Sequence, residues 1–216
     1  MNRFEGIIFD IDGTLTSTNE LIFATFRHVI EKHLNKNVTD QEIIDLFGPT
    51  EDVILKEWMN DDYQEARKDY YNFYETQHHL MADIYPGIIE ALKFIKSRNI
   101  PLSIYTGKGR DSSVITLQKI GVYHLFDMIV TGDDVEEHKP SPEGINQFVE
   151  KFKLEREKVL MIGDAPADIL AARSAGVKIA SVVWDAYAKE QVLEMKSDYV
   201  FETVDELIKF LKENLE

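Results

Sequence analysis

Short apolar runs recur along the chain, and polar turn residues follow most of them. The first run, 6–11, reads GIIFDI and ends in acidic residues and a glycine. Apolar runs of this length are typical of strands that are buried on both faces in a parallel sheet. The pattern predicts strands at residues 6–11, 102–105, 128–130, 159–162 and 179–183.

Helical patterns lie between these runs, with apolar residues spaced three and four positions apart. Proline in a first turn, a Thr-x-x-Glu capping box and a glycine after the last turn mark their ends. Strands that alternate with helices indicate an α/β fold with a doubly wound parallel sheet. Helices are predicted to begin near Pro86, Arg110, Pro166 and Thr203, with Gly121 and Gly176 ending the second and third.

The stretch from about residue 18 to residue 80 interrupts this alternation, because it contains helical patterns and no convincing strand. Thr39-x-x-Glu42 is a second capping box, and the stretch is rich in aromatic residues, which we interpret as the core of an insert. An insert of about 60 residues is far longer than an ordinary connection between a strand and a helix. We therefore expect an α/β core at 1–15 and 82–216 and an all-helical cap domain at 16–81.

Two carboxylates stand at the end of the first predicted strand, in the sequence Asp10-Ile11-Asp12-Gly13-Thr14. Acidic residues usually occupy solvated turns. Here they directly follow a buried apolar run, where a charge costs free energy unless it is paired or used. In an open parallel sheet, ligands bind at the carboxyl ends of the strands. Asp10 and Asp12 are therefore candidate functional residues.

Three later polar groups occupy equivalent places. Thr106 and Gly107 follow the second predicted strand, Lys139 follows the third after a short acidic loop, and Asp164 and Asp168 follow the fourth. Each of these groups is weak evidence for a functional site by itself, since Gly-Asp turns and exposed lysines are common. Because a parallel sheet gathers the ends of its strands at one edge, we expect these side chains to converge on one crevice.

This set of residues resembles the four motifs of the haloacid dehalogenase (HAD) superfamily of phosphatases. The sequence DIDGT at 10–14, Thr106, Lys139 and the GDxxxD sequence at 163–168 occur in the superfamily's order. The resemblance covers the predicted core and implies a Rossmann-like fold. The helical insert is similar in position and length to the type 1 cap of that superfamily.

The resemblance implies roles for the core residues in the hydrolysis of a phosphate ester. Asp10 is expected to attack phosphorus and form an aspartyl phosphate. Asp12 is expected to protonate the leaving oxygen and then to activate the water that hydrolyses the intermediate. Thr106 and Gly107 would hydrogen-bond the phosphoryl group, and Lys139 would neutralise its charge and that of Asp10. The dehalogenases of the superfamily lack an acid at the position of Asp12, so the resemblance points to the phosphatases.

The resemblance also implies a magnesium ion, which prefers oxygen ligands. Asp10, the backbone carbonyl of Asp12, and Asp164 are the expected ligands. Asp168 is expected to orient Lys139 or a water on the metal rather than to bind the metal directly.

The cap loop Phe47-Gly48-Pro49-Thr50-Glu51 is similar to the caps of phosphoglycolate phosphatases and related pyrophosphatases. We expect Thr50 and Glu51 to reach down and hydrogen-bond the leaving group of a small phosphorylated metabolite. Inorganic pyrophosphatase and a β-phosphoglucomutase-like mutase remain alternatives. Such mutases have a basic residue just before a Glu-Asp pair in the cap, a place where this chain has Thr50.

A signalling module is the alternative outside the enzymes. Receiver domains also accept phosphate on an aspartate beside a magnesium ion, a lysine and a threonine or serine. They lack a long insert after the first strand, however, and their acceptor is not in a DxDGT sequence. We therefore favour the phosphatase.

Charge and composition limit the possible partners. The 24 Lys and Arg residues against 39 Asp and Glu residues give a net charge of -15, which repels nucleic acid and anionic membranes. Cysteine is absent, which excludes disulfides and thiolate metal sites. Because no apolar run is long enough for a signal peptide or a membrane span, we expect a soluble cytoplasmic protein. The histidines are expected at the surface or in simple packing. Lys108 and Arg110 are expected at the solvated surface, with added positive potential near the site as the alternative.

Overall fold

The computed structural model describes residues 3–46, 48–186 and 188–215. Its centre is a six-stranded parallel sheet with the strand order β5-β4-β1-β6-β7-β8. The strands are β1 (Gly6–Phe9), β4 (Leu102–Tyr105), β5 (Met128–Val130), β6 (Val159–Gly163), β7 (Lys178–Val182) and β8 (Tyr199–Phe201). The α/β prediction and its five strands are confirmed, and β8 is an additional strand of only three residues.

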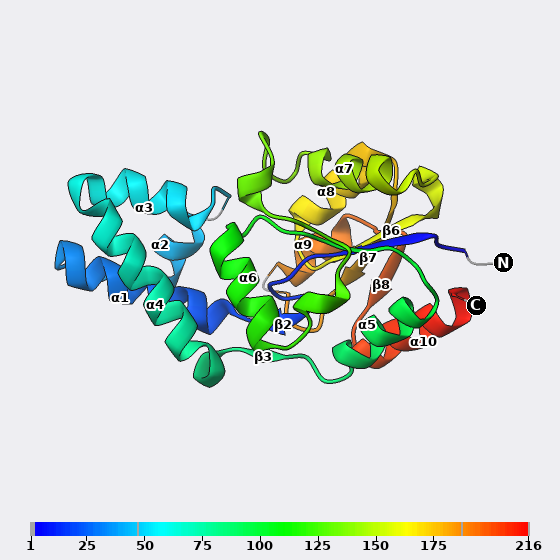
Figure 1. Cartoon of the computed structure of the whole chain (residues 1–216), viewed down its shortest axis with the longest axis horizontal. Coiled ribbons are helices and arrows are strands. Elements are labelled where there is room, and N and C mark those ends of the chain that lie inside the picture. Colours follow the sequence, from blue (N-terminus) through cyan, green and yellow to red (C-terminus); the bar gives the residue numbers. More distant parts are fainter. Residues whose placement is uncertain (1–2, 47, 187, 216) are drawn as a thin grey trace.

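Helices cover both faces of this sheet (Figure 1), because alternate residues of each strand point to opposite sides. Ile7 and Phe9 belong to a hydrophobic cluster with the helices at 88–97 and 204–214, whereas Ile8 belongs to a second cluster with the helices at 143–152 and 166–175. The core helices are α5 (Ile88–Ser97), α6 (Arg110–Lys119), α7 (Glu143–Phe152), α8 (Pro166–Ala175), α9 (Lys189–Glu194) and α10 (Val204–Asn214). Short 3-10 turns lie at η2 (Tyr123–Leu125), η3 (Gly132–Asp134) and η4 (Arg156–Lys158).

The helical insert stands to one side of the sheet (Figure 1) and consists of α1 (Asn19–Leu34), α2 (Asp40–Ile44), α3 (Glu51–Met59), η1 (Asn60–Asp62) and α4 (Tyr63–Met81). Its helices enclose a separate hydrophobic cluster in which Phe26, Tyr70 and Tyr74 are fully buried or nearly so. The interpretation of these aromatic residues as the core of an insert is therefore confirmed.

Two very short strands connect the insert to the core. β2 (Thr16–Ser17) pairs in antiparallel fashion with β3 (Asp83–Ile84), so the outgoing and returning chains run side by side. Thr16 Oγ1 also donates to the carbonyl of Asp83 at 2.6 Å. Because β2 follows β1 closely in the chain and β3 pairs with β2, both connections lie beside the residues that follow β1.

The insert also packs on the core through α4 and α6. The hydroxyl groups of Tyr74 and Thr116 are hydrogen-bonded at 2.8 Å, and both side chains are buried. His78, one turn further along α4, is 1% exposed and contacts the Tyr74 ring edge-on. Its burial agrees with a packing role.

The buried His78 predicts a specific pH dependence of stability. Burial and the nearby charges of Lys108 and Lys119 lower the pKa of His78 to about 4. In the unfolded chain the pKa is about 6.5, so the unfolded state binds more protons between these values. The folded state should therefore lose about 2 kcal/mol of stability to this group between pH 7.5 and pH 5.

Urea unfolding at the two pH values measures this loss. His78→Gln, which does not titrate, should show a smaller difference between pH 7.5 and pH 5 than the wild type. His79→Gln is the matched control, because the neighbouring His79 is exposed. An equal pH dependence in all three proteins would contradict a buried neutral His78.

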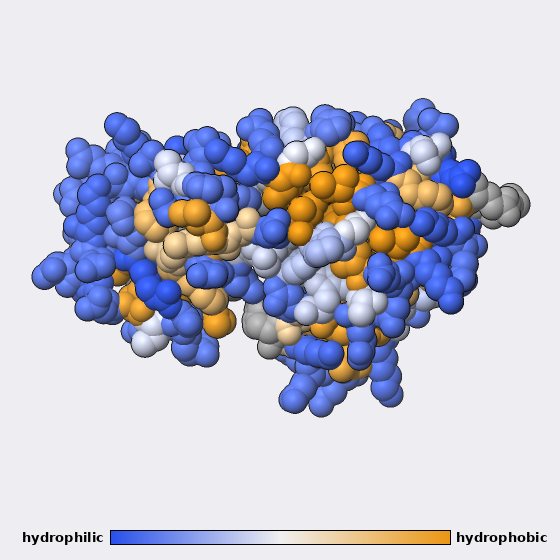
Figure 2. All heavy atoms as spheres, turned by 90° about the horizontal axis from the view of Figure 1, so that it is seen from below, coloured by the Kyte–Doolittle hydropathy of each residue, from blue (hydrophilic) through white to orange (hydrophobic). Residues whose placement is uncertain are grey.

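On the face shown in Figure 2, most side chains are hydrophilic, and hydrophobic side chains gather in patches between them. Among the described residues, no helix combines the length and the apolar character needed to cross a membrane.

Candidate active site

A cavity of about 210 Å³ lies between the ends of the core strands and the insert. Its floor is formed by charged and polar residues of the core, and its roof by residues of the insert. The floor includes Asp10, Asp12, Thr106, Gly107, Lys108, Lys139, Asp164 and Asp168, and the roof includes Asn19, Ile22, Phe26, Pro49, Glu51 and Ile54. All the core residues expected at the site therefore line one cavity.

The turn after β1 lies directly against Asp164. Gly13 has φ +75°, and a Cβ atom at this position would lie 2.2 Å from Asp164 Oδ2. Glycine is therefore required both for the backbone conformation and for the close approach of Asp164. Thr14 Oγ1 donates to Asp164 Oδ1 at 3.3 Å, which fixes that carboxylate beside the turn.

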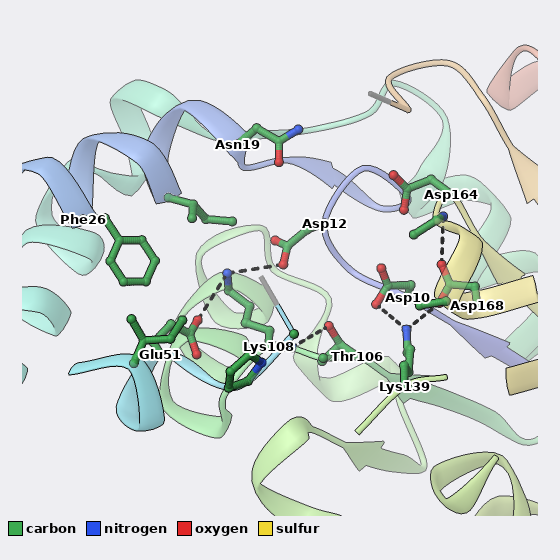
Figure 3. A pocket seen from close by; sticks show the side chains of 17 residues that line it. Asp10, Asp12, Asn19, Phe26, Glu51, Thr106, Lys108, Lys139, Asp164 and Asp168 are labelled. Carbon is green, nitrogen blue, oxygen red and sulfur yellow. Dashed lines mark hydrogen bonds and ion pairs between the residues drawn. The ribbon is translucent and has the colours of Figure 1, made fainter. Parts of the chain in front are cut away.

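Lys139 joins two of the carboxylates, as Figure 3 shows. Its Nζ lies 3.0 Å from Asp10 Oδ1 and 2.5 Å from Asp168 Oδ1. The other oxygen of Asp168 accepts from the backbone N–H of Ala165 at 3.0 Å. Both oxygens of Asp168 are thus engaged within the protein, one by Lys139 and the other by the backbone of Ala165.

The electrostatics of the floor follow from burial. Burial raises the pKa of Asp10 to about 6, with Lys139 opposing the rise and Asp168 and Asp12 adding to it. Burial, together with Asp10 and Asp168, raises the pKa of Asp164 well above its usual value. Burial by itself would lower the pKa of Lys139, but the neighbouring Asp10 and Asp168 raise it overall.

Three carboxylates of the floor could hold a metal ion. Asp10, Asp164 and Asp168 each offer an oxygen, and these oxygens all lie within 4.8 Å of one another. Within the part of the chain that the structure describes, Lys139 is the cation paired with this cluster, so one positive charge faces three buried acids. A hard divalent cation with oxygen ligands would compensate the remaining negative charge.

Thr106 and Gly107 follow β4 and face the same cavity. The side chain of Thr106 is 2% exposed, and its Oγ1 accepts from the backbone N–H of Lys108 at 3.3 Å. The threonine hydroxyl and the Gly107 backbone therefore lie where a phosphoryl group could be hydrogen-bonded.

The sequence profile of the Haloacid dehalogenase-like hydrolase family matches residues 7–182. The chain belongs to this family. A Caldanaerobacter subterraneus protein assigned as pyrophosphatase PpaX is 33% identical, with 97% of this chain and 96% of that protein covered. Pyrophosphatase PpaX of Bacillus pumilus is 31% identical, with 94% of each chain covered.

Solved structures of similar chains have the same fold. A Thermotoga maritima protein assigned as a β-phosphoglucomutase is 29% identical, with a TM-score of 0.76 over 97% of this chain and 99% of that one. A Haemophilus somnus protein assigned as a phosphoglycolate phosphatase is 23% identical, with a TM-score of 0.81 over 97% and 99%. Together with the family assignment, the relatives identify this haloacid dehalogenase-like hydrolase as a phosphatase.

Lys108 lies inside the site, although the sequence favoured a solvated position for it. Its side chain is 2% exposed, and its Nζ lies 3.3 Å from Asp12 Oδ2 and 3.7 Å from Glu51 Oε1. The expectation of a solvated surface lysine is wrong, because two carboxylates from distant segments surround it. Arg110, in contrast, is 43% exposed and pairs with Asp134, as expected for a surface residue.

The cap loop reaches the core of this hydrolase, but only part of it faces the cavity. Glu51 lines the cavity, and its carboxylate accepts hydrogen bonds from the core. Thr50 is 1% exposed and does not line the cavity; its methyl group packs against Gly132 instead. The position of Thr50 therefore differs from the expected contact with a leaving group, and Phe47 lies outside the described residues.

Proposed function

We propose that this phosphatase is a magnesium-dependent phosphomonoester hydrolase that acts on a small phosphorylated metabolite through an aspartyl phosphate at Asp10. The observation that supports this most is the position of Asp10 on the cavity floor, 3.0 Å from Lys139 Nζ and two residues before a second acid, Asp12. A nucleophile, a cation and an acid are thus close together at the end of one strand.

The proposed reaction has two steps. In the first, a carboxylate oxygen of Asp10 forms a bond to phosphorus while the bond to the leaving oxygen breaks, and Asp12 gives that oxygen a proton. In the second, a water molecule attacks phosphorus, Asp12 accepts a proton from it, and the bond from Asp10 to phosphorus breaks. Phosphate is released and both carboxylates return to their initial state.

The charge on the phosphoryl group is balanced by groups that are already in place. Lys139 stands beside Asp10, and the Thr106 hydroxyl and Gly107 backbone face the same part of the cavity. Donors held rigidly in a buried site stabilise developing charge more than donors in water do. The apolar roof, which includes Ile22, Phe26 and Ile54, would exclude water from the leaving group.

Magnesium fits the donor set of buried carboxylates. Asp10, the backbone carbonyl of Asp12, and Asp164 would hold it, while Asp168 remains engaged with Lys139 and Ala165. The ion would supply positive charge that reduces the repulsion between a carboxylate and a phosphate dianion.

The substrate is proposed only as a class. The names of the PpaX relatives favour inorganic pyrophosphate as a second candidate. A mutase is less favoured, since Thr50 stands where a mutase of this superfamily would have a basic residue.

Residues 16–81 are proposed to act as a cap that closes over the bound substrate, with β2 and β3 as the connections.

A panel of phosphate esters tests this proposal. With magnesium present, we expect release of phosphate from para-nitrophenyl phosphate and, faster, from one class of small phosphorylated metabolite. The panel should include phosphoglycolate, inorganic pyrophosphate and glucose 1-phosphate. Excess chelator should abolish turnover, and fluoroberyllate, which mimics the aspartyl phosphate, should inhibit it. Full activity in chelator would contradict the metal requirement, and conversion of glucose 1-phosphate to glucose 6-phosphate would favour the mutase.

A further inference from the structure

Glu51, the first residue of α3 in the insert, places its carboxylate on the core. Oε2 accepts from the backbone N–H of Gly109 at 2.7 Å, and Oε1 accepts from Ser112 Oγ at 2.6 Å. The side chain is 9% exposed. Both oxygens are thus engaged by residues that lie 58 and 61 positions later in the chain.

The two donors form the N-terminus of α6. Gly109 precedes the helix and has no side chain to cap it, and Ser112 is the third helical residue. In a capping box, the side chain of that third residue accepts from the N–H of the residue before the helix. Glu51 makes this bond from the insert, and a carboxylate at a helix N-terminus is also favoured by the helix dipole.

The same carboxylate lies next to a buried lysine. Glu51 Oε1 is 3.7 Å from Lys108 Nζ, and that nitrogen is 3.3 Å from Asp12 Oδ2 and 4.8 Å from the centre of the Tyr74 ring. Figure 3 shows the ammonium group between the two acids. Asp12 Oδ1 accepts from Thr18 Oγ1, so Thr18 and Lys108 together define the orientation of the Asp12 carboxylate.

The insert and the core approach each other closely at this contact. A Cβ atom added to Gly109 would lie 2.5 Å from Glu51 Oε2, and its next neighbour, Asp133 Oδ2, would be at 3.2 Å. Gly109 has φ -65° and ψ 162°, a conformation that alanine adopts without strain. Alanine at this position would therefore act mainly by displacing the Glu51 carboxylate.

We propose that Glu51 is a positioning residue for the acid/base step: it holds the segment 107–109 and Lys108, and through Lys108 it fixes the orientation of Asp12. The role of Asp12 in this inference rests on the proposed function. The arrangement links the position of the cap to the alignment of the acid, because Glu51 belongs to the insert and Asp12 to the core. Without the Glu51 carboxylate, Lys108 would pair with Asp12 alone and would be free to move with respect to it.

Esters with different leaving groups test this role. Phenyl phosphate needs a proton on its leaving oxygen much more than para-nitrophenyl phosphate does. Glu51→Ala should therefore lower kcat for phenyl phosphate about tenfold more than for para-nitrophenyl phosphate, with little change in KM for either ester. Glu51→Gln, which keeps one acceptor, should recover part of the loss. Glu57→Ala on the exposed side of α3 is the control and should leave both esters unaffected.

Gly109→Ala gives an independent variant. It should reproduce the selective loss on phenyl phosphate with Glu51 present, and it should add nothing in the Glu51→Ala protein, where the Oε2 atom that clashes with the new Cβ is gone. Equal losses on the two esters in Glu51→Ala, or additive effects in the double variant, would contradict the positioning role.

A measurement without turnover separates this inference from the proposed function. Because the chain has no cysteine, labels can be attached to cysteines introduced at the exposed Asp61 and Glu150, in the insert and the core. Glu51→Ala should broaden the distance distribution between the labels, whereas Glu57→Ala should not. A broadened distribution in a protein that hydrolyses no ester would overturn the proposed function and support the Glu51 contact. An unchanged distribution would overturn the contact.

Discussion

Replacing Asp10 with asparagine should reduce phosphate-ester hydrolysis on the order of 10⁴-fold. The carboxamide has nearly the same volume and still accepts a hydrogen bond from Lys139, so the site should keep its shape. It has no anionic oxygen to attack phosphorus, however, and the covalent route is closed. Turnover of para-nitrophenyl phosphate at saturating magnesium measures the loss.

Asp62→Asn is the matched control for this substitution, since Asp62 is exposed in the insert and makes no capping hydrogen bond. It should retain wild-type activity. Thermal unfolding of both variants checks that they are folded. An Asp10→Asn protein with more than a few per cent of wild-type turnover would show that Asp10 is not the nucleophile.

Replacing Lys139 with methionine should be the second most damaging change. Lys139 contacts both Asp10 and Asp168, and its side chain is 7% exposed. We expect a loss of about 10²- to 10³-fold in kcat, because charge on the phosphoryl group is no longer balanced. The pKa of Asp10 should also rise above about 6, since Lys139 opposes the effect of burial on it. A larger fraction of Asp10 would then be protonated and unable to attack near neutral pH.

The Lys139→Met protein should also be less stable, by about 3 kcal/mol, because two buried acids lose their cation. Added magnesium should restore part of that stability by binding the remaining carboxylates. Lys209→Met, at an exposed position of α10, is the control for both measurements. Wild-type kcat in Lys139→Met would contradict a role for this lysine in the reaction.

Much of the core site could be predicted from the sequence, because each residue lies beyond the carboxyl end of a strand of the same parallel sheet. Asp10, Thr106, Lys139 and Asp164 come from four separate segments and line one cavity. Their convergence depends only on the strands being parallel and adjacent, which the alternation of strands and helices already indicated. Strand β8 was missed because three residues, one of them the partly exposed Val200, give too weak a periodic signal.

The roles of Lys108 and Glu51 could not be predicted in the same way. Lysine in a Gly-Lys-Gly sequence is usually solvated. No residue near Lys108 in the sequence predicts its two carboxylate partners. Its burial depends on Glu51, 57 positions earlier, and on the angle at which the insert meets α6. That angle is set by the packing of α4 on α6, including the bond between Tyr74 and Thr116, which no local pattern encodes.

Trapping the phosphorylated enzyme tests the central claim most directly. The protein is mixed with its fastest substrate from the panel, quenched in acid within one turnover and reduced with borohydride, which converts an aspartyl phosphate to homoserine. Peptide mass spectrometry then locates the reduced residue. We predict homoserine at Asp10, in a yield that follows the burst of released leaving group, and none when substrate is omitted. Homoserine at another aspartate, or rapid turnover with Asp10 unmodified at every quench time, would contradict the account.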